Sequence, residues 1–239
     1  MSAFKTNKYL KADARESLIG NLTTTVLSIF LYTLSTMILS ERIASFSPES
    51  VLVSLLLSLF VFFIVNTCAN MLRIGLSCIF LKLQFGQKAS VGDLLYAFRN
   101  NSDAAVTISA FIAVQELFCI LPYLLFMTLA PLQNSPAFAV VSPLLLIAGV
   151  LGTIAVRIRY AVCTYLFLDF PGYTAGELIR GCTRLMKGHL GRLFGLYFSF
   201  IPLYFLSFLS LGVAGLWVSS YSHAAEAAFY KDLMNNAAF

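Results

Sequence analysis

The chain has 239 residues, of which 59% are apolar and only 11% are charged. Because soluble domains carry about 25% charged residues, this composition excludes a water-soluble globular protein. The mean hydropathy of +0.84 leaves no hydrophilic stretch long enough for a separate soluble domain. Sixteen Lys and Arg against eleven Asp and Glu give a net charge of +5. Since these residues border apolar runs, they indicate contact with a membrane surface and not with nucleic acid.

Six apolar runs follow one another along the chain, and a run of about 20 residues crosses a bilayer core of about 30 Å as a helix. The sequence therefore predicts an all-α fold, a polytopic bundle of six transmembrane helices. The expected spans are about 21–39, 51–83, 104–129, 137–168, 193–209 and 211–228. Residues 1–20 are expected to form a cytoplasmic amphipathic segment, 21–233 a single transmembrane domain, and 234–239 a cytoplasmic tail.

The positive charges are distributed unevenly, and Lys and Arg in short loops are retained on the cytoplasmic side. Twelve of the sixteen lie in the N-terminal segment, after the second and fourth spans, or near the C-terminus. The opposite loops hold only Arg42, and Arg73, Arg157 and Arg159 lie inside the second and fourth spans. This partition predicts a multi-pass protein with both termini in the cytoplasm.

A faint internal repeat joins the second and fourth spans. Arg73 and Arg157 are as far apart in the chain as Gly92 and Gly176, each of which follows a long apolar run. Fixed spacing is the signature of repeated units, whereas apolar sequence of low complexity also produces chance matches. The chain is therefore either three repeated hairpin units or a bundle without repeats.

Short amphipathic helices are predicted before three of the spans. Residues 94–98 and 178–186 precede the third and fifth spans, and Leu10, Ala14 and Leu18 share one helical face before the first. We expect these helices to lie in the plane of the membrane, against the headgroups. The cations expected to contact anionic lipids there are Lys88, Arg180, Arg184 and Lys187.

Three stretches together resemble a known family: Met71–Gly75, Gly92–Phe98 and Tyr221–Leu233. The chain resembles an uncharacterised family of six-span integral membrane proteins that is common in Gram-positive bacteria, and the resemblance covers nearly the whole chain. It implies the fold and a place in the bacterial plasma membrane. It implies no catalytic or binding residues, because the family has no assigned activity. Ser220 stands where the family pattern has a proline.

Several polar side chains lie within the predicted spans, where a charged residue costs about 2.5 to 3.5 kcal/mol on insertion scales. Glu116 lies about 18 Å into the third span at 1.5 Å per residue, and His223 and Glu226 share a face of the sixth. The candidate intramembrane polar site is Glu116, Gln115, His223, Glu226, Asn66 and Asn70. It is either a proton- or substrate-coupled site or a structural set of ion pairs.

The three arginines inside the spans are candidates for ion pairs or for contacts with lipid phosphate. Arg73 and Arg157 are expected near the cytoplasmic boundary, where they can reach the headgroups. Glu226 is expected to pair with Arg157 or Arg159. Glu116 is expected to lie too deep for Arg73, so its predicted partners are Asn66, a hydroxyl, water or His223.

No catalytic motif is present, and the five cysteines lack the spacing of a disulfide framework or a zinc site. We therefore expect neither an enzyme nor a bound metal or cofactor. The leading hypothesis is an integral membrane protein that binds or transports a small molecule or a lipid through its bundle. The alternative is an accessory or scaffold protein that docks a partner protein or anionic lipid through its basic cytoplasmic helices. The sequence leaves the ligand, the partner and the oligomeric state open.

Overall fold

The computed structural model describes residues 4–44, 51–128, 136–210 and 212–236. Within these ranges all regular elements are helices, joined by short turns and loops, and no residue there belongs to a strand. The order of the elements is α1 (Asn7–Leu18), α2 (Leu22–Ala44), α3 (Val51–Gln84), the 3-10 helix η1 (Val91–Leu95), α4 (Tyr96–Arg99), α5 (Ser102–Thr128), α6 (Pro136–Asp169), α7 (Ala175–Met186), α8 (Leu190–Phe198), α9 (Ile201–Leu209) and α10 (Val213–Asn236).

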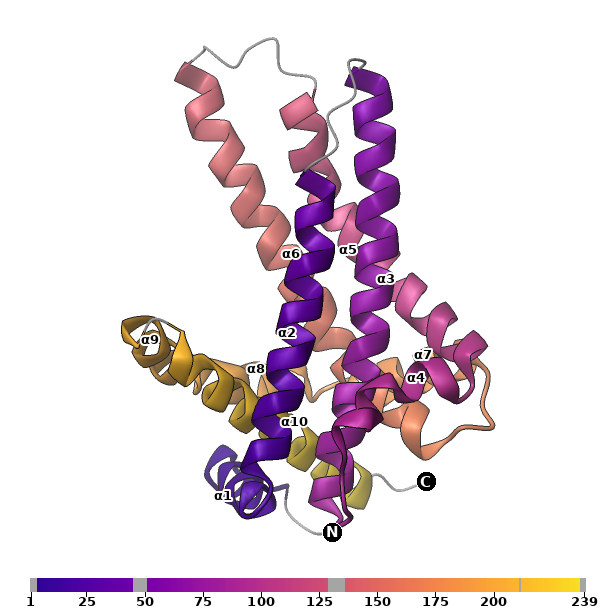
Figure 1. The fold of residues 1–239 in the computed structure, drawn as a ribbon, viewed down its shortest axis with the longest axis vertical. Coiled ribbons are helices and arrows are strands. Elements are labelled where there is room, and N and C mark those ends of the chain that lie inside the picture. Colours follow the sequence, from indigo (N-terminus) through magenta and orange to yellow (C-terminus); the bar gives the residue numbers. More distant parts are fainter. Residues whose placement is uncertain (1–3, 45–50, 129–135, 211, 237–239) are drawn as a thin grey trace.

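Four long helices, α2, α3, α5 and α6, stand upright side by side (Figure 1). They match the first four predicted spans, and α3 and α6 have 34 residues each. At 1.5 Å per residue such a helix is about 51 Å long, which exceeds the bilayer core by about 20 Å. One end of α3 and of α6 must therefore project beyond the hydrocarbon.

Helices α2–α3 form a first hairpin, α5–α6 a second and α8–α10 a third. The third hairpin differs from the first two. The predicted span 193–209 is divided into α8 and α9, which run away from the upright helices before α10 returns beneath them (Figure 1). The division has a local cause, because Pro202 in the first turn of α9 has no amide hydrogen to continue the hydrogen bonds of α8. Residues 234–236, assigned above to the tail, continue α10, and 237–239 lie outside the described residues.

Five stretches of the described helices are long and apolar enough to cross a membrane: Leu22–Leu39, Leu55–Gln84, Ser102–Met127, Phe138–Asp169 and Leu190–Leu209. This is the build of a membrane protein. The predicted sixth span is not among the five, because polar residues along α10, including Ser219, His223 and Glu226, lower its hydropathy.

The core lies where α3, α6 and α10 pack against one another. Each contributes large side chains that are almost fully buried, including Phe80 of α3, Tyr165 of α6 and Phe229 of α10. Small residues such as Ala225 let α10 approach closely. The N-terminal halves of α3 and α6 instead expose apolar residues, as expected for surfaces in contact with lipid.

The apolar faces of the short helices pack on protein, where the sequence predicted contact with the headgroups. Helix α1 packs on α10, η1 and α4 on α3, and α7 on α6. The predicted face of α1, Leu10, Ala14 and Leu18, is buried. Gly75 permits the contact of η1 with α3, because a Cβ there would lie 1.9 Å from the carbonyl oxygen of Leu94.

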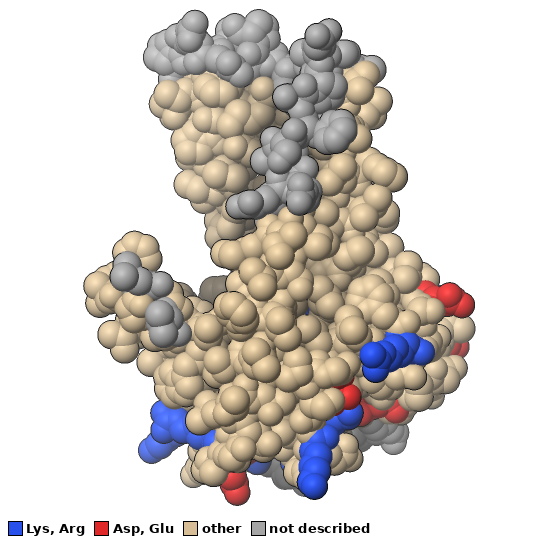
Figure 2. All heavy atoms as spheres, in the orientation of Figure 1, with Lys and Arg blue, Asp and Glu red and all other residues tan. Residues whose placement is uncertain are grey.

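The charged side chains gather at one end of the molecule. On the face in Figure 2, Lys, Arg, Asp and Glu lie in the lower part, where α1, η1, α4 and α7 surround the ends of α3 and α6, and the upper part carries none among the residues drawn in colour. We call this lower part the charged end. The projecting ends of α3 and α6 therefore lie in a polar environment.

Candidate functional site

Glu116 and Arg157 form an ion pair between α5 and α6. The Arg157 Nε donates a hydrogen bond to the Glu116 Oε1 at 2.8 Å. The two side chains differ in exposure, since Glu116 is 1% exposed and Arg157 is 45% exposed. The carboxylate is therefore enclosed by protein, whereas much of the guanidinium faces outwards.

Arg73 and Glu226 form a second contact between opposite charges, between α3 and α10. The Arg73 Nη2 lies 3.5 Å from the Glu226 Oε1, and the His223 Nδ1 lies 3.5 Å from the Oε2. Both distances are long for hydrogen bonds, so the attraction between Arg73 and Glu226 is mainly between charges. His223 also stacks on the ring of Phe80, with centroids 5.7 Å apart.

These pairings differ from the expected ones. Glu226 contacts Arg73, not Arg157 or Arg159, and Glu116 pairs with Arg157. The expected partners of Glu116 did not include Arg157, because the depth of Arg157 was measured from the outer end of its helix and that of Glu116 from the opposite end. Measured from the charged end, Glu116 lies about four turns from Ser102 and Arg157 lies about three turns from Asp169, which places them at about the same level. We refer to Arg73, Glu116, Arg157, His223 and Glu226 as the polar cluster.

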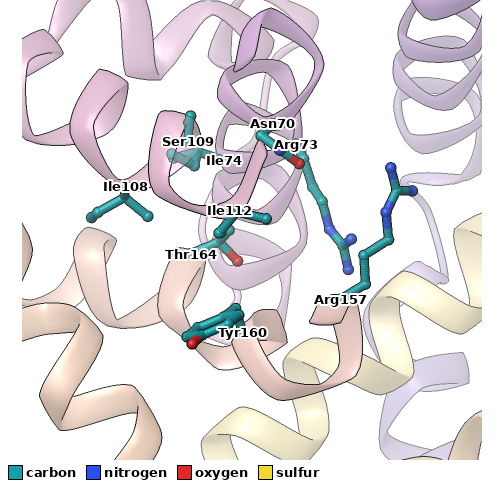
Figure 3. Close-up of a pocket in the computed structure, with 9 residues that line it drawn as sticks. All are labelled: Asn70, Arg73, Ile74, Ile108, Ser109, Ile112, Arg157, Tyr160 and Thr164. Carbon is teal, nitrogen blue, oxygen red and sulfur yellow. The ribbon is translucent and has the colours of Figure 1, made fainter. Parts of the chain in front are cut away.

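A small cavity of about 10 Å³ lies beside the cluster, between α3, α5 and α6, and Arg73 and Arg157 both line it. Figure 3 shows the Arg73 side chain running downwards from α3 and the Arg157 side chain running upwards from α6, both to the right of the other labelled residues. Asn70 and Ser109 also line the cavity, and the Asn70 Nδ2 and the Ser109 Oγ are buried without a hydrogen-bond partner among the described residues. The volume of this cavity is about that of one water molecule.

Three predicted site residues lie apart from the ion pairs. Gln115 donates to the hydroxyl of Tyr160 at 3.1 Å, and Asn66 donates to the Phe62 carbonyl one turn earlier in its own helix. The guanidinium of Arg159 lies 5.8 Å from the ring centroid of Tyr160. Asn66 therefore satisfies its amide locally and does not reach Glu116.

Three tyrosines near Arg73 were not anticipated from the sequence. Tyr32 of α2, Tyr165 of α6 and Tyr197 of α8 lie within electrostatic reach of its guanidinium, and Tyr197 also neighbours Glu226. Tyr32 and Tyr197 bring the first and third hairpins to the cluster. A tyrosine within an apolar helix follows no pattern that distinguishes a polar contact from packing, so the sequence carried no signal for them.

A larger groove of about 620 Å³ lies at the charged end, along α7 and the end of α10. It is lined by apolar residues such as Phe170 and Leu185 together with Arg184, Lys187 and His189. Burial and then the charge of Arg192 lower the pKa of His189, so its imidazole is neutral at pH 7. The four predicted lipid-contacting cations, Lys88, Arg180, Arg184 and Lys187, are all exposed.

A family described as "Protein of unknown function (DUF975)" matches residues 1–237. The chain belongs to this family, which confirms the resemblance to an uncharacterised family. Comparisons with curated proteins and with solved structures found no match.

Proposed function

Starting from this membership, we propose that the chain is a non-enzymatic membrane protein that binds a small molecule or a lipid at the polar cluster. The observation that carries the proposal is the asymmetry of the Glu116–Arg157 pair, in which the carboxylate is buried and the arginine is 45% exposed. A pair with a purely structural role is most stable when both charges are satisfied within the protein. Here the outward side of a guanidinium is available to an anionic ligand.

Binding is better supported than transport in this conformation. The cavity beside Arg73 and Arg157 holds about one water molecule, and a transported molecule would require the hairpins to separate. Transport through the bundle is a finer form of the same proposal, in which the three hairpins move relative to one another.

Mass spectrometry of compounds that co-purify with the protein in mild detergent tests the proposal. The variant is Arg157→Gln with Glu116→Gln, which removes both charges of the pair that carries the proposal and leaves neither partner unpaired. The matched control is Lys82→Gln with Asp93→Asn, which removes another ion pair, at the charged end, with a distance of 2.8 Å. We expect the first double variant to lose a compound that the wild type and the control retain. Identical co-purified compounds in all three would refute binding at the cluster.

We also propose that the chain consists of three repeated units. Each unit is a short helical segment followed by a hairpin: α1 with α2–α3, η1 and α4 with α5–α6, and α7 with α8–α10. In every case the short segment and the first hairpin helix pack on the second hairpin helix of the previous unit, and the first unit packs in this way on α10 of the third. This pattern closes a ring, which a chance order of helices would not produce.

Two junctions add a local argument for the repeat. Gly20 follows α1 and Gly188 follows α7 at the same offset, with φ angles of 82° and 88°. Both adopt the left-handed conformation that ends a helix. Their separation along the chain is twice that between Arg73 and Arg157, as expected for the first and third of three equal units. A chemical crosslink between cysteines at Arg15 and Tyr221, which are hydrogen-bonded at 3.0 Å, would test the closing contact of the ring.

The orientation is part of the proposal. We assign the charged end to the cytoplasm of a bacterial cell, with both termini inside, because cations are retained on that side. Cysteines introduced at Lys88 and Lys187 should react with a membrane-impermeant reagent only after the inner face is opened. Labelling of intact cells at Lys88 would reverse the orientation.

The alternative function is an accessory protein that docks a partner protein or anionic lipid through its basic cytoplasmic helices, and the groove at the charged end favours it. The groove is large enough for a ligand, and Arg184 and Lys187 line it. Replacing Lys88, Arg180, Arg184 and Lys187 by Gln would then abolish enrichment of anionic lipid or a partner protein, while the cluster variant would not. Enrichment that survives the four substitutions would exclude this alternative.

A further inference from the structure

From the exposure of Arg157 and the surfaces around it, we infer that the polar cluster binds a glycerophospholipid, with the lipid phosphate on the Arg157 guanidinium and an acyl chain along α6. This inference rests on the proposed function and names the ligand of the same site.

The guanidinium is held in a fixed orientation. Its Nε donates to Glu116 at 2.8 Å, and among the described residues no other acceptor is within hydrogen-bonding distance of it. The two terminal amino groups, with four N–H donors between them, are thus available on the exposed side. A planar guanidinium donates two parallel hydrogen bonds to phosphate, a geometry that the ammonium of lysine lacks.

The level of Arg157 along α6 matches that of lipid headgroups. Helix α6 begins at Pro136, and at 1.5 Å per residue the rise from there to Arg157 is about 31 Å. The hydrocarbon core is about 30 Å thick. With the apolar part of α6 in the core, the guanidinium is at the inner boundary, where the phosphates of that leaflet lie.

An apolar surface leads from the bilayer to this position. Leu144, Ile147, Leu151 and Ile154 follow one another along α6 at helical spacing and are all exposed. Arg157 comes one turn after Ile154. An acyl chain in contact with this stripe would carry its headgroup to the guanidinium.

The opposite wall comes from the third hairpin. Helix α8 packs on α6, and α8 and α9 expose Phe194, Phe198, Phe205 and Phe208. Figure 2 shows a hollow between α8 and α9, at the left, and the upright helices. Exposed aromatic surface of this extent favours lipid contact over contact with water. A soluble anion would satisfy the guanidinium but would leave both apolar walls uncovered, and so a phospholipid fits better.

The experiment is a lipid titration of the delipidated full-length protein in detergent, followed by native mass spectrometry. The probes are phosphatidylglycerol, phosphatidylcholine and diacylglycerol. Phosphatidylglycerol has a phosphate and a net negative charge, phosphatidylcholine has a phosphate and no net charge, and diacylglycerol has acyl chains without a phosphate. The wild type should bind both phospholipids about tenfold more tightly than diacylglycerol, since a charge-assisted hydrogen bond contributes about that factor. Glycerol phosphate, which lacks acyl chains, should bind weakly.

The test variant is Arg157→Gln with Glu116→Gln, which leaves no buried carboxylate unpaired; its melting temperature reports whether it folds. The control is Arg159→Gln, which removes an exposed arginine close by in the same helix. Phospholipid binding should fall to the diacylglycerol level in the double variant and stay at the wild-type level in the control. If the double variant does not fold, Arg157→Lys serves instead and should weaken phospholipid binding while binding to diacylglycerol is unchanged.

Several results would overturn the inference: equal binding of diacylglycerol and phospholipids, unchanged phospholipid binding in both Arg157 variants, an equal loss in the Arg159 control, or a dimer that covers this face without lipid. If phospholipid binding is unaffected but another co-purified compound is lost on changing the cluster, the proposed function stands and only the inference fails. If the wild type retains no compound of any kind, both fail.

Discussion

The different exposure of Glu116 and Arg157 predicts an asymmetric response to breaking their ion pair. Arg157→Gln leaves a carboxylate that is 1% exposed without its cation, and an unpaired buried charge costs about 3 to 5 kcal/mol. Glu116→Gln leaves an arginine that is already 45% exposed and can turn towards the headgroups, so the expected cost is about 1 kcal/mol. Removing both charges should restore much of the stability lost in Arg157→Gln.

Thermal unfolding in detergent, followed by circular dichroism, measures these differences. For a chain of this length about 1 kcal/mol corresponds to 2 to 4 °C, so Arg157→Gln should lower the melting temperature by about 10 °C and Glu116→Gln by about 3 °C. The double variant should lose about 2 kcal/mol, which gives a coupling energy of about 3 kcal/mol, as expected for residues in direct contact. Equal losses in the two single variants with additive effects in the double variant would refute the argument from exposure.

Two further predictions concern the contact between η1 and α3. Burial alone would raise the pKa of Asp93, but hydrogen bonds from Lys82 and the Ser90 backbone outweigh it and lower the pKa; Asp93→Asn should therefore cost about 1 kcal/mol at pH 7. Because the folded-state pKa is depressed, this stabilisation is present above the unfolded value of about 4 and is lost as the pH falls through the folded value, so the melting temperatures of variant and wild type should converge in acid. Gly75→Ala should cost about 3 kcal/mol through overpacking, whereas Gly172→Ala, with nothing within 4 Å of the added Cβ, should leave the melting temperature unchanged.

The long helices could be predicted from the sequence because their signal is local. An uninterrupted apolar run specifies a helix wherever it lies, and α3 begins at the predicted Val51 and ends one residue after the predicted end. The buried face of α1 was equally accessible, since Leu10, Ala14 and Leu18 follow helical spacing. The third hairpin was less accessible, because hydropathy does not register how Pro202 interrupts a helix.

The polar contacts could not be derived in the same way. Which arginine meets Glu226 depends on how α10 crosses α3 and α6, and hydropathy carries no information on crossing geometry. The composition of α10 gives a partial signal, since the alanines between Ala224 and Ala228 permit close packing. The composition does not indicate which helix α10 packs against. The fate of the apolar faces of the short helices was undetermined for the same reason, because a membrane surface and a protein surface select the same amphipathic pattern.

The three-unit proposal also accounts for why the polar cluster lies where it does. Arg73, Arg157 and Glu226 each lie about three turns before the C-terminal end of their helix, α3, α6 and α10 respectively. A ring of three similar helices brings such positions together at its centre, and three arginines there would repel one another. With Glu226 in the third unit, one central arginine has an acidic partner within the ring. Arg157 instead pairs with Glu116 of α5, which is not one of the three helices α3, α6 and α10. One side of its guanidinium therefore stays exposed, and we propose that a phospholipid binds there.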